Sequence, residues 1–142
     1  MPKLVRELMR RGVLTCTLDT PIKEVAQIMV VNRTRYVVVS DERNAVAGII
    51  SARSILKAWG KDLEKVTAKD VLLPYTVTTR PDTPLVSAIK EMQKRRIQHL
   101  VIVSERPPHK QAVGILSASD LVVHMARAKP KEAPAKKTEE KP

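Results

Sequence analysis

The sequence is poor in several residue types, and each scarcity narrows what the protein can be. Its 142 residues include no Phe, two Tyr and one Trp, so aliphatic side chains must fill the core. Cys16 is the only cysteine, which excludes an intrachain disulfide and a thiolate metal cluster. The four glycines form neither a Walker loop nor a GxGxxG motif, and no G-x-S-x-G motif occurs. We therefore expect a protein that is not an enzyme.

The sequence also lacks long apolar stretches. No run of about 18 apolar residues occurs, as a membrane-spanning helix would require. The residues after Met1 lead directly into an amphipathic segment, without the apolar core of a signal peptide. We therefore expect a cytoplasmic protein with no membrane partner. Charged residues reach 29% while Asn and Gln are scarce, a composition that leans towards a thermophilic source.

Positive charge is abundant. Lys and Arg number 26 against 15 Asp and Glu, which gives a formal net charge of +11. Such a balance favours anionic partners, namely phosphorylated ligands, nucleic acid or acidic proteins. Residues 129–142 consist of Lys, Glu, Pro and Ala with little else and no periodicity, which predicts a disordered basic tail. That tail holds five lysines against three glutamates, so most of the charge belongs to the preceding part.

The chain contains an internal repeat. Asp19-Thr20-Pro21 recurs 63 residues later as Asp82-Thr83-Pro84, and Gly48 recurs 66 residues later as Gly114. The three additional residues fall in a segment that contains Pro107-Pro108, where a loop tolerates an insertion. We therefore predict two tandem units, residues 3–66 and 67–128, followed by the tail.

Each unit is predicted to have the same order of elements. A short helix precedes a β-α-β-β-α unit, in which a Thr-Pro pair starts the first long helix with Thr as N-cap and Pro at N1. Apolar residues then recur at helical spacing, as in Leu85, Ala88, Ile89 and Met92 or Ile22, Val25, Ala26 and Met29. The expected ranges are helices at 5–10, 52–59, 68–73 and 118–128, two further helices that begin at Pro21 and Pro84, and strands at 14–17, 36–40, 45–50, 76–79, 99–103 and 112–116.

The expected fold class is α/β (α+β), with small mixed sheets flanked by helices. The strand after each Thr-Pro helix should lie parallel to the strand before it through a right-handed crossover. The next strand should be its antiparallel neighbour. The continuous run Val37-Val38-Val39 predicts a strand that is covered on both faces. One unit of about 60 residues would be marginally stable alone, so the two should pack together as a pseudo-twofold pair.

The strongest functional motif is Gly114-Ile115-Leu116-Ser117-Ala118-Ser119-Asp120, which reads as a buried strand that runs into a helix. The glycine lets another group approach the backbone, and the serines supply a helix cap and free hydroxyls. Asp120 lies in the first helical turn, where it could accept two hydrogen bonds from a ribose diol. The first copy, Gly48 to Ser54, has Ser54 at the position of the aspartate.

Both units resemble the CBS domain, and the tandem resembles a CBS pair, or Bateman module. In the first unit the matching pieces are Leu8-Met9 leading to Leu14-Thr15-Cys16-Thr17, Asp19-Thr20-Pro21, Arg35-Tyr36-Val37-Val38-Val39-Ser40-Asp41 and Gly48-Ile49-Ile50-Ser51. In the second they are Asp82-Thr83-Pro84, Gln98-His99-Leu100-Val101-Ile102 and the Gly114 to Asp120 motif. The resemblance covers residues 3–128.

The resemblance implies a regulatory module that binds an adenine nucleotide between the repeats. AMP is the expected ligand, ADP and ATP are alternatives, and S-adenosylmethionine is less favoured. It also implies a homodimer. We expect action in trans on a separate protein, which the sequence does not identify. It implies no catalytic cofactor. A metal site is not expected, since His99, His109 and His124 lack the spacing of metal ligands.

Carried over residue by residue, the resemblance implies a cleft that uses Asp120. There Asp120 would hold the ribose diol, Leu14 and its neighbours would enclose the adenine, and Arg35 would face the phosphate. With a single arginine at that place, a monophosphate is favoured, although Arg53 or Lys57 could add charge. The full set of cleft residues is Val13, Leu14, Thr15, Thr34, Arg35, Tyr36, Ser117, Ser119 and Asp120.

A second cleft would be weaker or empty because Ser54 replaces the aspartate. A hydrogen bond to a charged group contributes about 1.5–3 kcal/mol against about 1 for a neutral one, so affinity should fall by roughly one to two orders of magnitude. Its expected residues are Ser51, Arg53, Ser54, Thr76, Val77, Thr78, Ile97, Gln98 and His99.

Simpler interpretations remain open at this point. Asp120 could merely favour a helix N-terminus, and Arg35 could be a solvated surface charge. The positive charge could mark a nucleic-acid-associated protein, although the near absence of aromatic residues for base stacking argues against it. The protein could also be a structural oligomer scaffold with a vestigial ligand site.

Overall fold

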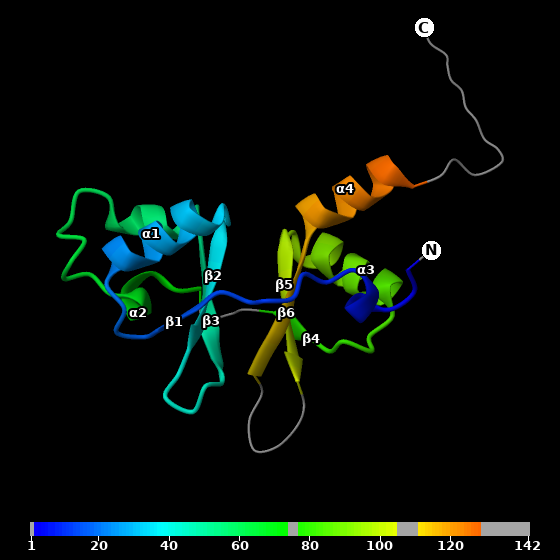
Figure 1. Cartoon of the computed structure of the whole chain (residues 1–142), viewed down its shortest axis with the longest axis horizontal. Coiled ribbons are helices and arrows are strands. Elements are labelled where there is room, and N and C mark those ends of the chain that lie inside the picture. Colours follow the sequence, from blue (N-terminus) through cyan, green and yellow to red (C-terminus); the bar gives the residue numbers. More distant parts are fainter. Residues whose placement is uncertain (1, 74–76, 105–110, 129–142) are drawn as a thin grey trace, which may run out of the picture.

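The computed structural model describes residues 2–73, 77–104 and 111–128. The chain forms two similar lobes, each with a three-stranded sheet that carries helices on its outer face (Figure 1). The inner strands of the two sheets face each other at the centre of the molecule. The predicted fold class, two mixed sheets flanked by helices, is therefore confirmed. The predicted tail at 129–142 lies outside the described residues.

Both sheets have the predicted topology. In the first, β1 (Thr15–Thr17) pairs parallel with β2 (Tyr36–Ser40), which pairs antiparallel with β3 (Val46–Ser51). In the second, β4 (Thr78–Thr79) is parallel to β5 (His99–Ser104), which is antiparallel to β6 (Gln111–Ser117). The register of each antiparallel pair shifts at an equivalent point, between Val39 and Ser40 and between Ile102 and Val103. The two lobes thus repeat each other in detail.

The crossover helices α1 (Ile22–Asn32) and α3 (Leu85–Arg95) bury the predicted apolar faces against the sheets. Their N-caps differ from the prediction, because Pro21 and Pro84, and not the threonines, occupy those positions. The threonine hydroxyls instead close the preceding turns. Thr20 Oγ1 accepts a hydrogen bond from the Thr17 N–H (3.0 Å). The Thr79 hydroxyl donates to Thr83 Oγ1 (2.8 Å).

The short helices are shorter than predicted, and they pack on the opposite lobe. The 3-10 turn η1 (Val5–Glu7) ends early because Arg10 pairs with the β6 residue Ile115. Val5 and Met9 lie in the core of the second lobe, whereas Ala68 and Val71 of α2 (Ala68–Val71) lie in the core of the first. Figure 1 shows the N-terminal segment beside α3 before it crosses to β1. Each short helix therefore belongs to one repeat in the sequence but packs in the lobe that the other repeat forms.

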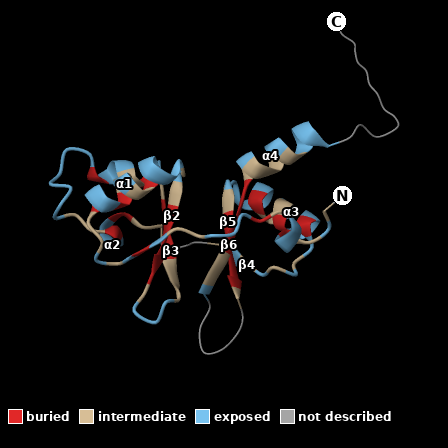
Figure 2. Cartoon of the chain, viewed as in Figure 1, coloured by how far each residue is buried: buried red, intermediate tan, exposed pale blue. Residues whose placement is uncertain are grey.

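The helices that end the two lobes are unlike each other. The first is a 3-10 helix, η2 (Ser54–Ala58), where the sequence predicts a longer helix from residue 52. Ser51 and Ser54 exchange hydrogen bonds across this turn, and each hydroxyl accepts the other's N–H (2.9 and 3.0 Å), which tightens the backbone. The second, α4 (Ala118–Arg127), is a regular α-helix that extends away from its sheet and contains no buried residue (Figure 2).

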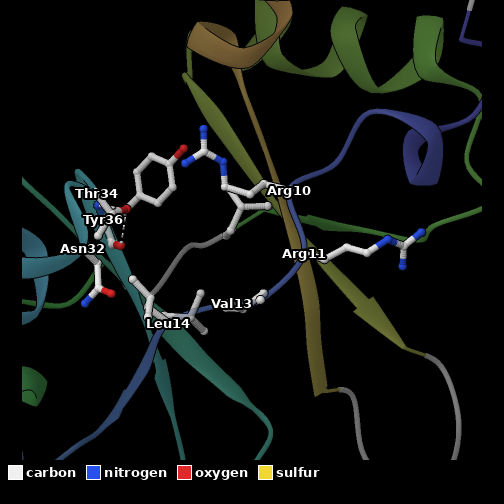
Figure 3. A pocket seen from close by; sticks show the side chains of 10 residues that line it. Arg10, Arg11, Val13, Leu14, Asn32, Thr34 and Tyr36 are labelled. Atoms are coloured by element: carbon white, nitrogen blue, oxygen red, sulfur yellow. Dashed lines mark hydrogen bonds between the residues drawn. The ribbon is translucent and has the colours of Figure 1, made fainter.

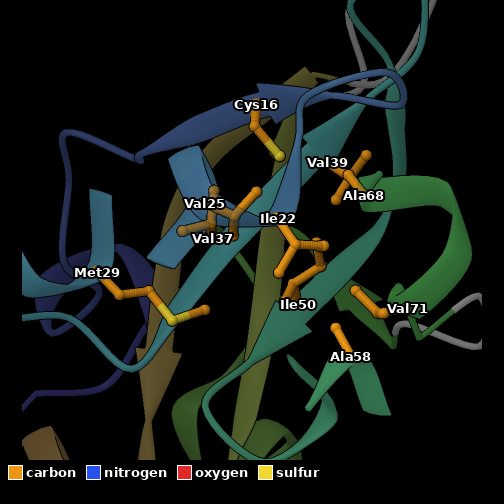
Figure 4. Packing of buried hydrophobic residues seen from close by; sticks show 10 residues of the cluster. All are labelled: Cys16, Ile22, Val25, Met29, Val37, Val39, Ile50, Ala58, Ala68 and Val71. Atoms are coloured by element: carbon orange, nitrogen blue, oxygen red, sulfur yellow. The ribbon is translucent and has the colours of Figure 1, made fainter. Parts of the chain in front are cut away.

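In the part of the chain that the structure describes, three apolar clusters hold the molecule together. One fills each lobe, and the first of these, around Ile22 and Ile50, is drawn in Figure 4. The third lies between the sheets and joins Val38 and Ile49 to Val101, Val103 and Ile115. Val37 and Val39 point into the first lobe while Val38 points to the interface, so β2 is covered on both faces as predicted. Within the described residues, no helix has the length and apolar character needed to cross a membrane.

Candidate ligand-binding site

Two glycines position the segments that line the site. A Cβ atom on Gly114 would lie 2.7 Å from Met9 Sδ and 3.1 Å from the Arg10 carbonyl oxygen. This close approach lets Arg10 and Ile115 exchange backbone hydrogen bonds of 2.7 and 2.9 Å. Gly48 plays the same part in the first lobe, where a Cβ atom would lie 2.8 Å from the Leu73 carbonyl oxygen. The predicted role of the glycines, to admit a neighbouring group to the backbone, is confirmed.

One cavity lies beside the segment that leads into β1. It has a volume of about 220 Å³ and contains four residues of the predicted Asp120 cleft, Val13, Leu14, Thr34 and Tyr36. Figure 3 shows the Tyr36 ring directed toward the Arg10 guanidinium, whereas the Arg11 side chain extends to the other side. The remaining lining residues are Arg10, Arg11, Gly12, Asn32, Val38 and Ile115. The apolar part of this wall suits a flat aromatic group.

Asp120 lies at the start of α4, and Arg10 holds its carboxylate. Arg10 Nη2 donates to Asp120 Oδ1 at 2.8 Å, with 66% of the arginine side chain and 21% of the aspartate side chain exposed. Asp120 Oδ2 is buried without a hydrogen-bond partner among the described residues. The Asp120 N–H donates to Ser117 Oγ (3.1 Å), so Ser117 caps the helix as predicted. The carboxylate therefore keeps one unused acceptor, which is costly inside a protein. Asp120 does not line the cavity beside β1; with Leu8, Arg10 and His124 it lines a separate hollow.

Tyr36 connects this carboxylate with a second, larger cavity. Burial raises the pKa of the Tyr36 phenol, although a hydrogen bond with Ser117 opposes the shift. The Tyr36 ring lies 5.2 Å from the His99 ring, its counterpart in the second repeat. Burial also lowers the pKa of His99, which keeps the imidazole neutral near pH 7. Tyr36 lines both cavities, so the two share a wall.

The larger cavity has a volume of about 380 Å³ and receives residues from both lobes. It combines residues that the sequence assigns to two separate clefts. Arg35, Tyr36, Ser117 and Ser119 come from the Asp120 cleft. Ser51, Arg53, Val77, Ile97, Gln98 and His99 come from the other, and Ile49, Ala52, Leu73 and Arg96 complete the lining.

Several predicted site residues lie elsewhere. Thr15 is exposed on β1 and lines neither cavity, although it pairs with Val38 and so shares the face of the sheet that is turned to the interface between the lobes. Thr78 lines a separate hollow with Thr79 and Ser87. Ser54 is 6% exposed and its hydroxyl is used within its own turn. Thr76 and His109 lie outside the described residues.

Sequence reasoning missed Arg10 and Arg96. Arg10 reaches the site only because the N-terminal segment packs on the second lobe, which no local pattern indicates. Arg96 follows α3 in a left-handed conformation (φ 55°), as Arg33 follows α1 (φ 53°). The repeat shift of 63 residues relates these two arginines and could have drawn attention to them.

Other reactive side chains stay apart from the cavities. Cys16 is buried in the first lobe, and desolvation raises the pKa of its thiol to about 11. In the part of the chain that the structure describes, no three His, Cys, Asp or Glu side chains gather at one place. The site therefore offers one carboxylate, several arginines and apolar walls.

A comparison with protein families identifies the family that has this architecture. The family model for the CBS domain matches residues 5–61 and 67–127. The chain belongs to the CBS domain family. The resemblance to a tandem CBS pair is therefore confirmed. In a CBS pair, the two repeats correspond to the two lobes seen here, with the short helices exchanged between them.

Similar proteins include both enzymes and solved CBS pairs. Homoserine O-acetyltransferase of Methanosalsum zhilinae is 27% identical over 117 residues, which cover 82% of this chain but only 23% of that enzyme. The CBS domain pair of protein MJ0100, in complex with 5′-methylthioadenosine and S-adenosyl-L-methionine, has a TM-score of 0.77 and 23% identity over 88% of this chain and 98% of that one. CBS domain protein PAE2072 from Pyrobaculum aerophilum, complexed with AMP, has a TM-score of 0.74 and 25% identity over 88% of this chain and 99% of that one.

Proposed function

We propose that this CBS pair is a regulatory module that binds an adenosine-derived ligand, with AMP as the simplest candidate, between its two lobes. Asp120 carries the proposal, because its partly buried carboxylate has an oxygen without a partner among the described residues and is held by Arg10, which lines the cavity beside β1. The complexes of PAE2072 with AMP and of MJ0100 with two adenosyl compounds support this ligand class. The likeness to the CBS relatives shows the fold, and the proposed ligand contacts come from the residues of this chain.

The adenine would lie in the smaller cavity. Leu14 and Val13 form one side of it, and Val38 and Ile115 supply apolar surface from β2 and β6. A volume of about 220 Å³ is below the usual range of about 300–1,000 Å³ for sites that take a whole ligand. We therefore place only the base there. The sugar would then extend toward Asp120 and the phosphate toward the larger cavity, along the wall formed by Tyr36.

The ribose would replace Arg10 as the partner of Asp120. The two hydroxyls of a ribose diol can each donate to one carboxylate oxygen, whereas Arg10 occupies Oδ1 and leaves Oδ2 unpaired. A hydrogen bond to a charged acceptor contributes about 1.5–3 kcal/mol, while an exposed ion pair contributes about 0.2–1 kcal/mol. The exchange should therefore favour the ligand.

Regulation would follow from a ligand that contacts both lobes. Adenine and phosphate contacts involve β2 of the first lobe, and the ribose contact involves α4 of the second. Such a ligand can change the packing of the lobes only as far as it binds one arrangement better than another. We propose that the altered arrangement acts on a partner protein in trans and that the module works as a homodimer.

Calorimetric titration with AMP tests the proposal. Wild-type chain should bind one AMP per chain, and Asp120→Ala should weaken that binding by about 10- to 100-fold, through loss of one or two charged hydrogen bonds. Asp19→Ala is the matched control, because Asp19 is an exposed carboxylate outside both cavities and its removal changes the charge equally. If nucleotide-free wild-type chain binds none of AMP, ADP, ATP and S-adenosylmethionine, the proposed function is refuted.

A further inference from the structure

An exposed tryptophan ends the 3-10 helix η2. Trp59 has 85% of its surface exposed, the largest fraction among the large hydrophobic side chains that the structure describes. Leu56, three residues earlier, is 61% exposed. The opposite side of η2 packs on the first lobe, since Ala58 is 1% exposed and Ile55 lies against the core cluster. Leu56 and Trp59 are thus not needed to hold the helix in place.

Arg53, Leu56 and Trp59 form one row on the surface, which we name the η2 stripe. Side chains three positions apart lie one above the other in a 3-10 helix, and these residues have that spacing. The Leu56 N–H donates to the Arg53 carbonyl (3.3 Å), and the Trp59 N–H donates to the Leu56 carbonyl (3.0 Å), so the backbone fixes the alignment. Gly60 then turns the chain (φ 86°) into an exposed loop at the left end of the molecule (Figure 2).

The charges along the η2 stripe are positive. Arg53, Lys57 and Lys61 are exposed, and in the described part of the chain none of them forms an ion pair with a carboxylate. The nearest acidic residues in the sequence are engaged, since Asp62 accepts a hydrogen bond from the Glu64 N–H (3.1 Å) and Glu64 forms an ion pair with α1 (3.7 Å). An exposed tryptophan among unpaired cations suits an apolar segment that carries carboxylates.

We infer that the η2 stripe is the docking surface for a short acidic segment of a partner protein, which places apolar side chains on Leu56 and Trp59 and a carboxylate on Arg53. At about 2 Å per residue the stripe is about 12 Å long, which about four residues of extended chain would cover. A second copy of this chain fits poorly, because a symmetric contact would bring one positive patch against another. Single-stranded nucleic acid also fits poorly, since successive bases stack on several aromatic rings and the neighbour of Trp59 in the stripe is aliphatic.

The η2 stripe adjoins the larger cavity. Arg53 lines that cavity together with Ser51 and Ala52, and it is also the first residue of the stripe. Hydrogen bonds between Ser51 and Ser54 (2.9 and 3.0 Å) join the cavity wall to the start of η2. An anionic ligand in the cavity would therefore compete with the partner's carboxylate for Arg53. This coupling rests on the proposed function, whereas docking of the acidic segment rests on the stripe alone.

A displayed library of short random peptides without tryptophan tests the inference, selected on the wild-type chain and counter-selected on Trp59→Ala. Trp59 is the only tryptophan of the chain, so its fluorescence reports docking of synthetic copies of the enriched peptides. Leu56→Ser and Lys57→Glu alter the surface but keep this signal. Val86→Ser and Lys90→Glu are the matched controls, because both side chains are exposed on α3 of the other lobe. Circular dichroism verifies that each variant is folded.

We expect the enriched peptides to carry Asp or Glu beside apolar residues, and their docking to move the Trp59 emission to shorter wavelength. Leu56→Ser should weaken binding at least about tenfold and Lys57→Glu at least about threefold, while the controls stay within about twofold of wild type. A selection without enriched peptides, peptides without acidic residues, or equal binding by the two variants and the wild type would overturn the inference.

Two further measurements separate the other occupants and the coupling. Loss of a dimer in Trp59→Ala by light scattering would assign the η2 stripe to a second copy, and binding of oligouridine that requires Trp59 would assign it to RNA; either result would overturn the inference. AMP should weaken peptide binding. Peptide binding that bound AMP leaves unchanged would contradict the coupling alone. Peptide binding by a chain that binds no adenosine compound would support the stripe and contradict the proposed function.

Discussion

Replacement of Gly48 by alanine tests how closely the segment at Leu72 and Leu73 packs against β3. The new Cβ atom would meet the Leu73 carbonyl oxygen and Leu72 Cδ1, both at 2.8 Å. The Leu73 backbone cannot easily retreat, because its N–H donates to the Ile49 carbonyl at 2.8 Å. Such overpacking costs about 1–3 kcal/mol. For a chain of this size about 1 kcal/mol corresponds to about 4 °C, so Gly48→Ala should lower the melting temperature by about 4–12 °C.

Gly114→Ala is the matched comparison in the second lobe. Its Cβ atom would meet Met9 Sδ at 2.7 Å, but this is the flexible part of a side chain, and the nearest backbone atom, the Arg10 carbonyl oxygen, lies at 3.1 Å. We therefore expect a smaller loss for Gly114→Ala than for Gly48→Ala. Thermal unfolding followed by circular dichroism provides both values. A melting temperature of Gly48→Ala within about 1 °C of wild type, or a larger loss for Gly114→Ala, would refute the reasoning.

Three further predictions concern single side chains. Arg10→Ala should raise the affinity for adenosine by up to about fivefold in calorimetry, since it removes a competitor for Asp120, and a weaker affinity would contradict that role. Burial raises the pKa of Cys16 to about 11, so iodoacetamide at pH 8 should modify the folded chain about a hundredfold more slowly than the unfolded chain by mass spectrometry; equal rates would count against burial of the thiol. Burial lowers the pKa of His99, so the unfolded chain binds the proton more readily, and stability to urea should fall as the pH drops below about 6.5. His99→Gln should reduce that fall, and an unchanged pH dependence would contradict the assignment.

Local sequence patterns, together with the rule for crossover connections, were enough to predict the sheets and the buried faces of the long helices. Val37 to Val39 had to be covered on both faces because an uninterrupted valine run has no face for solvent, and Val38 indeed packs between the lobes. The faces of α1 and α3 followed from apolar spacing in the same way. Helix starts were less predictable, since Thr20 and Thr83 could either cap a helix or close a turn. In the structure both close the turn, because their hydroxyls accept hydrogen bonds from Thr17 and Thr79 of the preceding strands.

The arrangement of the site was beyond the reach of local patterns. Val5 and Met9 could pack on either repeat, because both repeats offer similar apolar surfaces, and only the folded chain shows that they join the second lobe. Arg10 therefore meets Asp120 across a separation of 110 residues. The same assembly merges parts of two expected clefts into one cavity with Arg35, Arg53 and Arg96. The assignment of ligand-binding roles to these residues stays a prediction.

Methyl NMR spectroscopy during a titration with AMP tests the central claim most directly. The account predicts saturable shifts of the methyl signals of Val13, Leu14 and Ile115, which line the cavity assigned to adenine. The methyl signals of Val25 and Val71, buried in the core of the first lobe, should stay in place. Saturable AMP binding without shifts at Val13, Leu14 and Ile115 would contradict the proposed site, and no binding at all would contradict the proposed function.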